Sequence, residues 1–175
     1  MELRLNHQWT LWYDKTDLTV CDDNWDQFLI KIQSIDTFEK FWNLFNNTPS
    51  IFDLPIGSNF HFFIYGIEPK WEDFHNLNGG KWVISFPRSN SQDLEKIWEL
   101  SLLALVSGRF SSEGTQNING LVVNVRKNEI RFSIWTKNAD NETIQLKIGN
   151  FWKKIIQDDI KDIKYGFDYF PHSSS

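Results

Sequence analysis

Apolar and polar residues alternate in several short segments of the chain, as they do in strands of a sheet that has one buried face. The alternation predicts strands over residues 8–13, 28–32, 60–65 and 81–86. Two further strands, over 121–126 and 130–136, are separated by three polar residues and are therefore predicted to form a hairpin. A last edge strand is predicted in the tail that follows residue 161.

Other segments show the spacing of an amphipathic helix, with apolar residues at i, i+3, i+4 and i+7. The first predicted helix spans 37–46, with Asp36 as its N-cap and Glu39 at the reciprocal capping position. The second spans 92–107 and stops at Gly108. The third has a stripe of five apolar residues on one face: Ile144, Ile148, Phe151, Trp152 and Ile155.

Together these elements indicate an α+β fold, namely a curved antiparallel sheet backed by three helices on its convex face. Short connections favour antiparallel pairing, and the apolar stripes of the helices need a face of the sheet to cover. The other face of the sheet is then free for another role. We expect a single domain over residues 1–175, with flexible ends at about 1–6 and 168–175.

The composition is that of an ordinary globular domain, with 175 residues of which 41% are hydrophobic and 23% charged. A net charge of −5 argues against a broad basic face for nucleic acid but is compatible with a small anion site. The single cysteine, Cys21, excludes an internal disulfide, and no apolar run approaches the roughly 20 residues of a membrane span. Because the amino terminus lacks the apolar stretch of a signal peptide, we expect a cytoplasmic protein, with the nucleus as a second location.

Nine tryptophans are more than a core of this size ordinarily holds, so some of them are expected at the surface. Trp71 follows Pro69 in the segment GIEPKWED, whose glycine closes a strand, and is therefore predicted on a loop. Trp25 lies in another polar loop, over residues 14–27. If the two loops meet over the open face of the sheet, their indoles flank a slot that has the carboxylate of Glu72 at its edge.

A slot of this kind suits guanine. A carboxylate accepts two hydrogen bonds from the ring N–H and the exocyclic amine of guanine, a donor pattern that no other common base offers. A methylated, positively charged base gains a further ~0.5 to 2 kcal/mol of cation–π attraction from the indoles. Arg126 and Arg131 flank the hairpin turn with Lys127 between them, where they can follow phosphates. The alternative is that both loop tryptophans close over the core.

The sequence has no recognisable catalytic centre or metal site. Its four histidines are scattered, and no group of His, Cys and Asp has the spacing of metal ligands. We therefore expect no cofactor, and each histidine is interpreted as a satisfied surface or core residue. If the protein were an enzyme acting on a nucleotide, Glu72 or Asp73 would be the base and a divalent metal the usual aid.

Several tryptophan-containing motifs follow one another along the chain: NHQWTLWY, FEKFWNLF, GIEPKWED, GGKWVISF, GLVVNVR and FSIWT. In this order and spacing they resemble the eukaryotic translation initiation factor 4E family, the mRNA cap-binding proteins. The resemblance runs from about Trp9 to Trp152 and so covers most of the chain. It implies a curved antiparallel sheet backed by three helices, with the 7-methylguanosine cap bound on the concave face.

Carried over residue by residue, the resemblance implies that Trp25 and Trp71 sandwich the methylated base while Glu72 holds its Watson–Crick edge. Trp135 corresponds to the tryptophan that touches the methyl group. The remaining cap-binding positions are basic and would serve the phosphates: Arg126, Arg131, Lys81 and Lys127. The expected small ligands are 7-methyl-GTP and 7-methyl-GDP.

Two of the basic positions depart from the family pattern. Lys81 stands where the family usually has arginine, which keeps the charge but loses the planar guanidinium fork. Asn128 stands where a lysine is frequent, which removes a cation. Both departures bear on the affinity for the cap phosphates.

The resemblance also implies a second surface, on the convex helices, for an amphipathic peptide from a factor 4G-type scaffold or a 4E-binding repressor. Trp42 would be its central anchor, whereas periodicity alone favours a core position for this residue. Four further residues belong to this surface, and the last two of them reverse the usual leucine–glutamate order: Phe38, Leu103, Glu99 and Leu100. Five other tryptophans are interpreted as core: Trp9, Trp12, Trp82, Trp98 and Trp152.

The leading interpretation is a monomeric, non-enzymatic protein that binds capped mRNA and passes it to a translation scaffold. The first alternative is a cap-binding translational repressor of the same fold that does not recruit the scaffold. The second alternative is a nucleotide- or cap-processing enzyme.

Overall fold

The computed structural model describes residues 1–16, 28–88, 91–161 and 165–172. Within these ranges seven strands form one antiparallel sheet with the order β2-β1-β3-β5-β6-β4-β7. The strands are β1 Arg4–Lys15, β2 Ile30–Thr37, β3 Ser58–Ile64, β4 Gly80–Pro87, β5 Ile118–Val125, β6 Glu129–Thr136 and β7 Gly166–Pro171. The predicted hairpin is confirmed as β5 and β6, and the predicted edge strand as β7, which pairs with β4.

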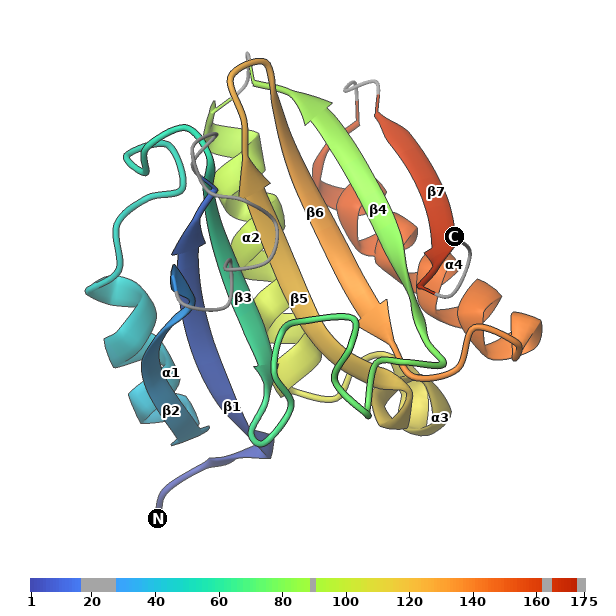
Figure 1. Cartoon of the computed structure of the whole chain (residues 1–175). Coiled ribbons are helices and arrows are strands. Elements are labelled where there is room, and N and C mark those ends of the chain that lie inside the picture. Colours follow the sequence, from blue (N-terminus) through green and yellow to red (C-terminus); the bar gives the residue numbers. More distant parts are fainter. Residues whose placement is uncertain (17–27, 89–90, 162–164, 173–175) are drawn as a thin grey trace.

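The helices lie behind one face of the curved sheet, while the loop between β3 and β4 lies in front of the other (Figure 1). The described residues contain four helices: α1 Phe38–Asn46, α2 Ser91–Val106, α3 Ser111–Gln116 and α4 Glu142–Asp159. The α+β prediction is confirmed, but the count of three helices was wrong by α3. The segment SSEGTQ has no apolar periodicity, so nothing in the pattern separates this short helix from a loop.

The core fills the space between the helices and the convex face of the sheet. Trp9 of β1 and Phe62 of β3 stack at 5.0 Å between ring centroids, and Trp98 of α2 stacks on Phe60. Trp152 of α4 is fully buried and donates its indole N–H to Ser101 of α2 at 2.9 Å. The core position of Trp9, Trp98 and Trp152 is therefore confirmed.

Trp12 was wrongly assigned to the core. Side chains alternate across a strand, and β1 already directs Trp9 and Leu11 toward the helices. Trp12 therefore faces the opposite, concave side, where it lies beside His61 of β3 and has the Lys31 ammonium 5.2 Å from its ring centroid. Trp82 is half-buried and packs against the core from β4.

The start of α1 also differs from the prediction. Strand β2 continues to Thr37, and the hydroxyl of this residue, rather than Asp36, caps the helix by accepting from the Lys40 N–H at 3.3 Å. Asp36 instead pairs with the side chains of Arg4 and Lys40. Glu39 is therefore not at the reciprocal position of the cap that forms.

Both ends of the chain carry more regular structure than expected. Strand β1 starts at Arg4 and buries Leu5, so residues 4–6 belong to the sheet. Residues 168–171 belong to β7 and pair with β4. The expected flexible ends were therefore too long, because ladder hydrogen bonds hold these residues in place.

Candidate functional site

The loop over residues 66–79 folds back against the concave face of the sheet (Figure 1). Gly66 has φ +88°, a conformation that lets the chain turn directly after β3. Ile67 then joins Phe63 and Val122 in a small buried apolar cluster on this face. Trp135 of β6 packs edge-on against Phe63 at 5.4 Å between ring centroids. The loop is thus anchored at its start by apolar packing.

Two polar residues fix the rest of the loop. The Asp73 carboxylate accepts from the backbone N–H groups of Glu68 at 3.0 Å and His75 at 2.9 Å. Asn76, fully buried, donates to the carbonyls of Glu68 and Lys70 and accepts from Asn119 of β5 at 2.9 Å. Burial alone would raise the pKa of Asp73, but the hydrogen bonds from His75 and Glu68 outweigh it and lower the pKa. Asp73 is therefore engaged in loop structure, which weakens its case as a catalytic base.

The same loop leaves Trp71 and Glu72 outside. Trp71 is 51% exposed, which confirms that it lies on a loop and not in the core. Neither Trp71 nor Glu72 has a side-chain hydrogen bond, ion pair or ring contact within the described part of the chain. An exposed indole and an adjacent carboxylate are thus held by a fixed backbone. Trp25, the predicted second wall of the slot, lies outside the described residues.

Three cationic side chains are grouped near this loop on the concave face. Lys81 of β4 is opposite Trp135 of β6, with its ammonium 6.0 Å from the indole centroid. Burial, and secondly the charge of Arg131, lower the pKa of Lys81. Arg131 of β6 pairs with Glu129 at the start of the same strand. Arg126 follows β5 and donates to the carbonyls of Val125 at 3.0 Å and Ser58 at 3.4 Å.

The predicted basic positions are therefore not equivalent. Burial, and secondly the charge of Arg131, lower the pKa of Arg126, while Asp14 and Glu129 act in the opposite direction. Lys127 is exposed in the hairpin turn beside the exposed Asn128. The structure places Lys81 and Arg131 on one surface with Trp135, but it leaves Lys127 at the rim.

His172 was missed as a member of this site. Its backbone N–H donates to the Gly79 carbonyl at 2.9 Å, and its ring lies 4.4 Å from the Trp135 ring between centroids. Burial, and secondly the charge of Lys81, lower the pKa of His172 to about 4. This contact depends on the pairing of β7 with β4, so no local signal in the sequence could have revealed it.

A buried polar cluster on the same face was also missed. His61 of β3 shares a hydrogen bond with the Asp14 carboxylate of β1, and Asn59 donates to the same carboxylate at 3.2 Å. Asn124 of β5 donates to Asn59 at 2.7 Å. The interpretation of His61 as a satisfied residue holds for its Nε2 atom, whereas Nδ1 is buried without a partner.

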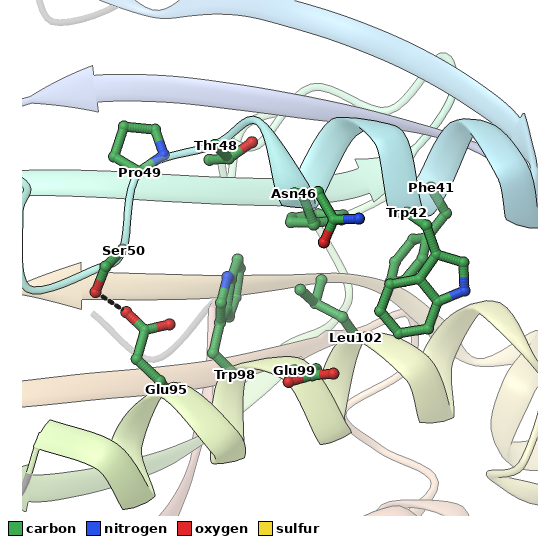
Figure 2. A pocket seen from close by; sticks show the side chains of 11 residues that line it. Phe41, Trp42, Asn46, Thr48, Pro49, Ser50, Glu95, Trp98, Glu99 and Leu102 are labelled. Atoms are coloured by element: carbon green, nitrogen blue, oxygen red, sulfur yellow. Dashed lines mark hydrogen bonds between the residues drawn. The ribbon is translucent and has the colours of Figure 1, made fainter.

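A second candidate site lies on the convex side, between α1 and α2. Figure 2 shows Trp42 of α1 across from Glu99 and Leu102 of α2, with Trp98 deeper in the groove. The pocket has a volume of about 170 Å³, and Glu95 at its far end accepts from the Ser50 hydroxyl. Trp42 is 39% exposed, so the core position that periodicity favours was wrong.

The other residues predicted for this surface are placed less directly. Glu99 is exposed and lines the pocket with Trp42. Phe38, Leu100 and Leu103 are half-buried and pack against the core without lining the pocket. The buried Leu102 takes part in the pocket instead. The reversed order of Glu99 and Leu100 thus places a carboxylate beside Trp42.

Two classes of site find no support in the part of the chain that the structure describes. No three His, Cys, Asp or Glu side chains among these residues come together to hold a metal ion. None of the helices there is both long and apolar enough to cross a membrane.

Comparison with known proteins points to one family. Residues 4–175 match the model of the family described as eukaryotic initiation factor 4E. The chain is 38% identical over 164 residues to eukaryotic translation initiation factor isoform 4E of Capsicum annuum, an alignment that covers 94% of this chain and 78% of the relative. It is 36% identical over 171 residues to eukaryotic translation initiation factor 4E of Saccharomyces cerevisiae, covering 98% and 77%.

Solved structures give the same result. A complex of C. elegans eIF4E-3 with the 4E-binding protein Mextli and cap analog is similar with a TM-score of 0.86 and 32% identity, covering 98% of this chain and 94% of that chain. A complex of Ascaris suum eIF4E-3 with m7G cap is similar with a TM-score of 0.87 and 32% identity, covering 100% and 94%.

Proposed function

This chain belongs to the eukaryotic initiation factor 4E family, and we propose that it binds the 7-methylguanosine cap of mRNA on the concave face of its sheet. Members of this family are cap-binding translation factors and not enzymes. The observation that carries the proposal is the pair Trp71 and Glu72, exposed on a loop whose backbone is fixed by Asp73 and Asn76.

The chemistry of this pair matches one face and one edge of the base. The flat indole of Trp71 stacks on the positively charged 7-methylguanine ring, and Trp25 is the proposed partner on its other face. The Glu72 carboxylate accepts from the ring N–H and the exocyclic amine of guanine. Because the loop is already ordered, little conformational entropy is lost when the base binds.

The cap phosphates then meet the cationic residues of the same face. Lys81 and Arg131 are the strongest candidates, because both lie on the sheet beside Trp135. Arg126 already donates to two carbonyls, and Arg131 is paired with Glu129, so both would have to exchange these partners for phosphate oxygens. Lys127 contributes longer-range attraction from the rim.

On the convex side we propose that Trp42 and Glu99 receive an amphipathic helix from a factor 4G-type scaffold. A 4E-binding repressor peptide would use the same groove, so initiator and repressor roles are distinguished by the partner and not by the groove. The protein then acts as a monomer in the cytoplasm, where capped mRNA is translated.

Retention on immobilised 7-methyl-GTP tests the cap site. We expect the wild type to bind, to elute with free 7-methyl-GTP and to resist elution with GTP, whose base lacks the positive charge. Glu72→Gln should not be retained, because the charge-assisted hydrogen bonds to the guanine edge, ~1.5 to 3 kcal/mol, are weakened. Glu68→Gln is the matched control, since Glu68 lies on the same loop and pairs with Lys70.

Two outcomes would contradict this function. Equal elution by GTP and 7-methyl-GTP would show that the site does not select the methylated base. Conversion of 7-methyl-GTP to a product during incubation would favour the cap-processing enzyme. Identification of the proteins that co-elute with the wild type would separate the scaffold from a repressor.

A further inference from the structure

A pocket of about 450 Å³ lies on the concave face beyond the proposed cap site, over β6, β4 and β7. It is lined by Lys81, Val83 and Ser85 of β4, by Arg131 of β6 and by Asp168 and Phe170 of β7. These residues share one face because they sit at matching register positions of three neighbouring strands. The pocket is therefore part of the sheet and does not depend on a loop.

The pocket is continuous with the proposed cap site. Trp135 of β6, Lys81 of β4 and Phe170 of β7 stand in one row across the three strands, since Lys81 is opposite Trp135 on one side and opposite Phe170 on the other. Side chains that lie directly opposite in an antiparallel pair are about 5 Å apart at Cβ. Lys81 therefore separates the cap site from Phe170 by the width of a single strand.

The charges divide the pocket into two parts. Lys81 and Arg131 lie on the side of the cap site and suit the phosphates of its ligand. On the far side, the exposed carboxylate of Asp168 disfavours phosphate. The far side also presents Phe170, whose ring is 49% exposed and suits stacking on a planar group.

We propose that this pocket holds the nucleoside on the far end of the cap triphosphate, that is, the first transcribed nucleotide of the mRNA. Its base stacks on Phe170, and Asp168 accepts a hydrogen bond from an exocyclic amine. Adenine, cytosine and guanine carry such an amine and uracil does not, so the pocket favours the first three bases. This inference rests on the proposed cap-binding function and adds to it a preference for the nucleotide that follows the cap.

The test compares 7-methyl-GTP with the dinucleotide caps m7GpppA and m7GpppU by fluorescence titration. We expect Phe170→Ala to bind m7GpppA about fivefold or more weakly than the wild type, and 7-methyl-GTP within about twofold. Asp168→Ala should remove the preference of the wild type for m7GpppA over m7GpppU. Leu146→Ala on α4, where a side chain of similar exposure (47%) lies far from this face, should leave every affinity unchanged.

Failure of this inference is distinguishable from failure of the cap function. If wild type and Phe170→Ala bind 7-methyl-GTP and bind m7GpppA equally well, the cap site stands and the nucleotide pocket does not. An equal loss for both ligands in Phe170→Ala would place Phe170 in the cap site and overturn the inference. If the wild type binds neither 7-methyl-GTP nor m7GpppA, the proposed function fails and the nucleotide pocket fails with it.

Discussion

Two exposed tryptophans, Trp71 and Trp42, lie on opposite sides of the sheet and are supported in different ways. Trp71 stands on a loop whose shape is set by polar bonds from Asp73 and Asn76. Trp42 stands on a helix, beside an apolar pocket with a carboxylate, Glu99, at its rim. The first arrangement suits a rigid, flat, charged ligand, whereas the second suits an amphipathic helix that brings its own shape.

This difference makes the two sites separable. The helices and the sheet lie between them, and substitutions that share no partner usually have additive effects. A change at Trp71 should therefore leave the convex site unaltered, and a change at Trp42 should leave the concave site unaltered. Each of the following predictions tests this independence.

The largest effect is expected for Trp71→Ala. Stacking of about 1 to 3 kcal/mol and cation–π attraction of about 0.5 to 2 kcal/mol are both lost, so the affinity for 7-methyl-GTP should fall by roughly 30- to 1,000-fold. Quenching of tryptophan emission measures it, with a scaffold peptide as the reference ligand. Retention of near-normal affinity would remove Trp71 from the site, while a parallel loss of peptide binding would show that the two faces are coupled.

Trp42→Ala should have the next largest effect, and on the other ligand. A central aromatic anchor typically contributes about 2 kcal/mol or more, so the affinity for a scaffold peptide should fall about thirtyfold. The affinity for 7-methyl-GTP should stay within about twofold. Glu39→Gln, an exposed change on the same helix, is the control. Tight peptide binding by a folded Trp42→Ala variant would leave α1 without a recruiting role.

The sequence predicted the two exposed tryptophans with unequal success. Trp71 could be placed on a loop because Gly66 and Pro69 interrupt regular structure on both sides of a strand end. Trp42 could not be placed by periodicity, because its helical stripe is shared by the truly buried Phe41. Only the family resemblance put Trp42 at the surface, where the structure also has it.

What the pattern could not give depends on contacts between distant segments. The cap of α1 passed from Asp36 to Thr37 because Arg4, more than 30 residues away, pairs with Asp36. Trp12 left the core because its strand presents alternate faces, and the choice between the faces is made by the neighbouring strands. His172 joined the site only through strand pairing at the end of the chain.

A smaller effect on the cap is expected for Asn76→Ala. The change leaves the buried carbonyls of Glu68 and Lys70 and the amide of Asn119 short of a partner, which costs about 1 to 3 kcal/mol and loosens the loop. A loop that is only partly in its binding conformation lowers the apparent affinity, here by roughly three- to tenfold. Titration with 7-methyl-GTP and hydrogen exchange of the loop amides measure both steps. Faster exchange with unchanged affinity would mean that the ligand, and not the fold, positions Trp71.

The smallest effect concerns acid and the concave face. In the folded chain, burial and the charge of Lys81 lower the pKa of His172 from 6.5 to about 4. Between these two values the unfolded chain binds a proton that the folded chain does not, so acidification from pH 6.5 toward 4 favours unfolding. Above pH 6.5 the residue is neutral in both states and has no such influence. The Tm of the wild type should therefore fall through this window, and His172→Gln, which stays neutral, should show a shallower fall.

His7 and Asp73, whose pKa values are also lowered, account for part of the slope that remains in His172→Gln. The affinity of a scaffold peptide for the convex groove, measured at pH values where both proteins stay folded, should be the same for wild type and His172→Gln, since His172 contacts Trp135 on the other face. Parallel Tm curves for the two proteins would mean that His172 binds its proton at the same pH in the folded and the unfolded chain. In that case the packing against Trp135 leaves the imidazole in contact with water, and His172 does not distinguish the concave face from the convex one.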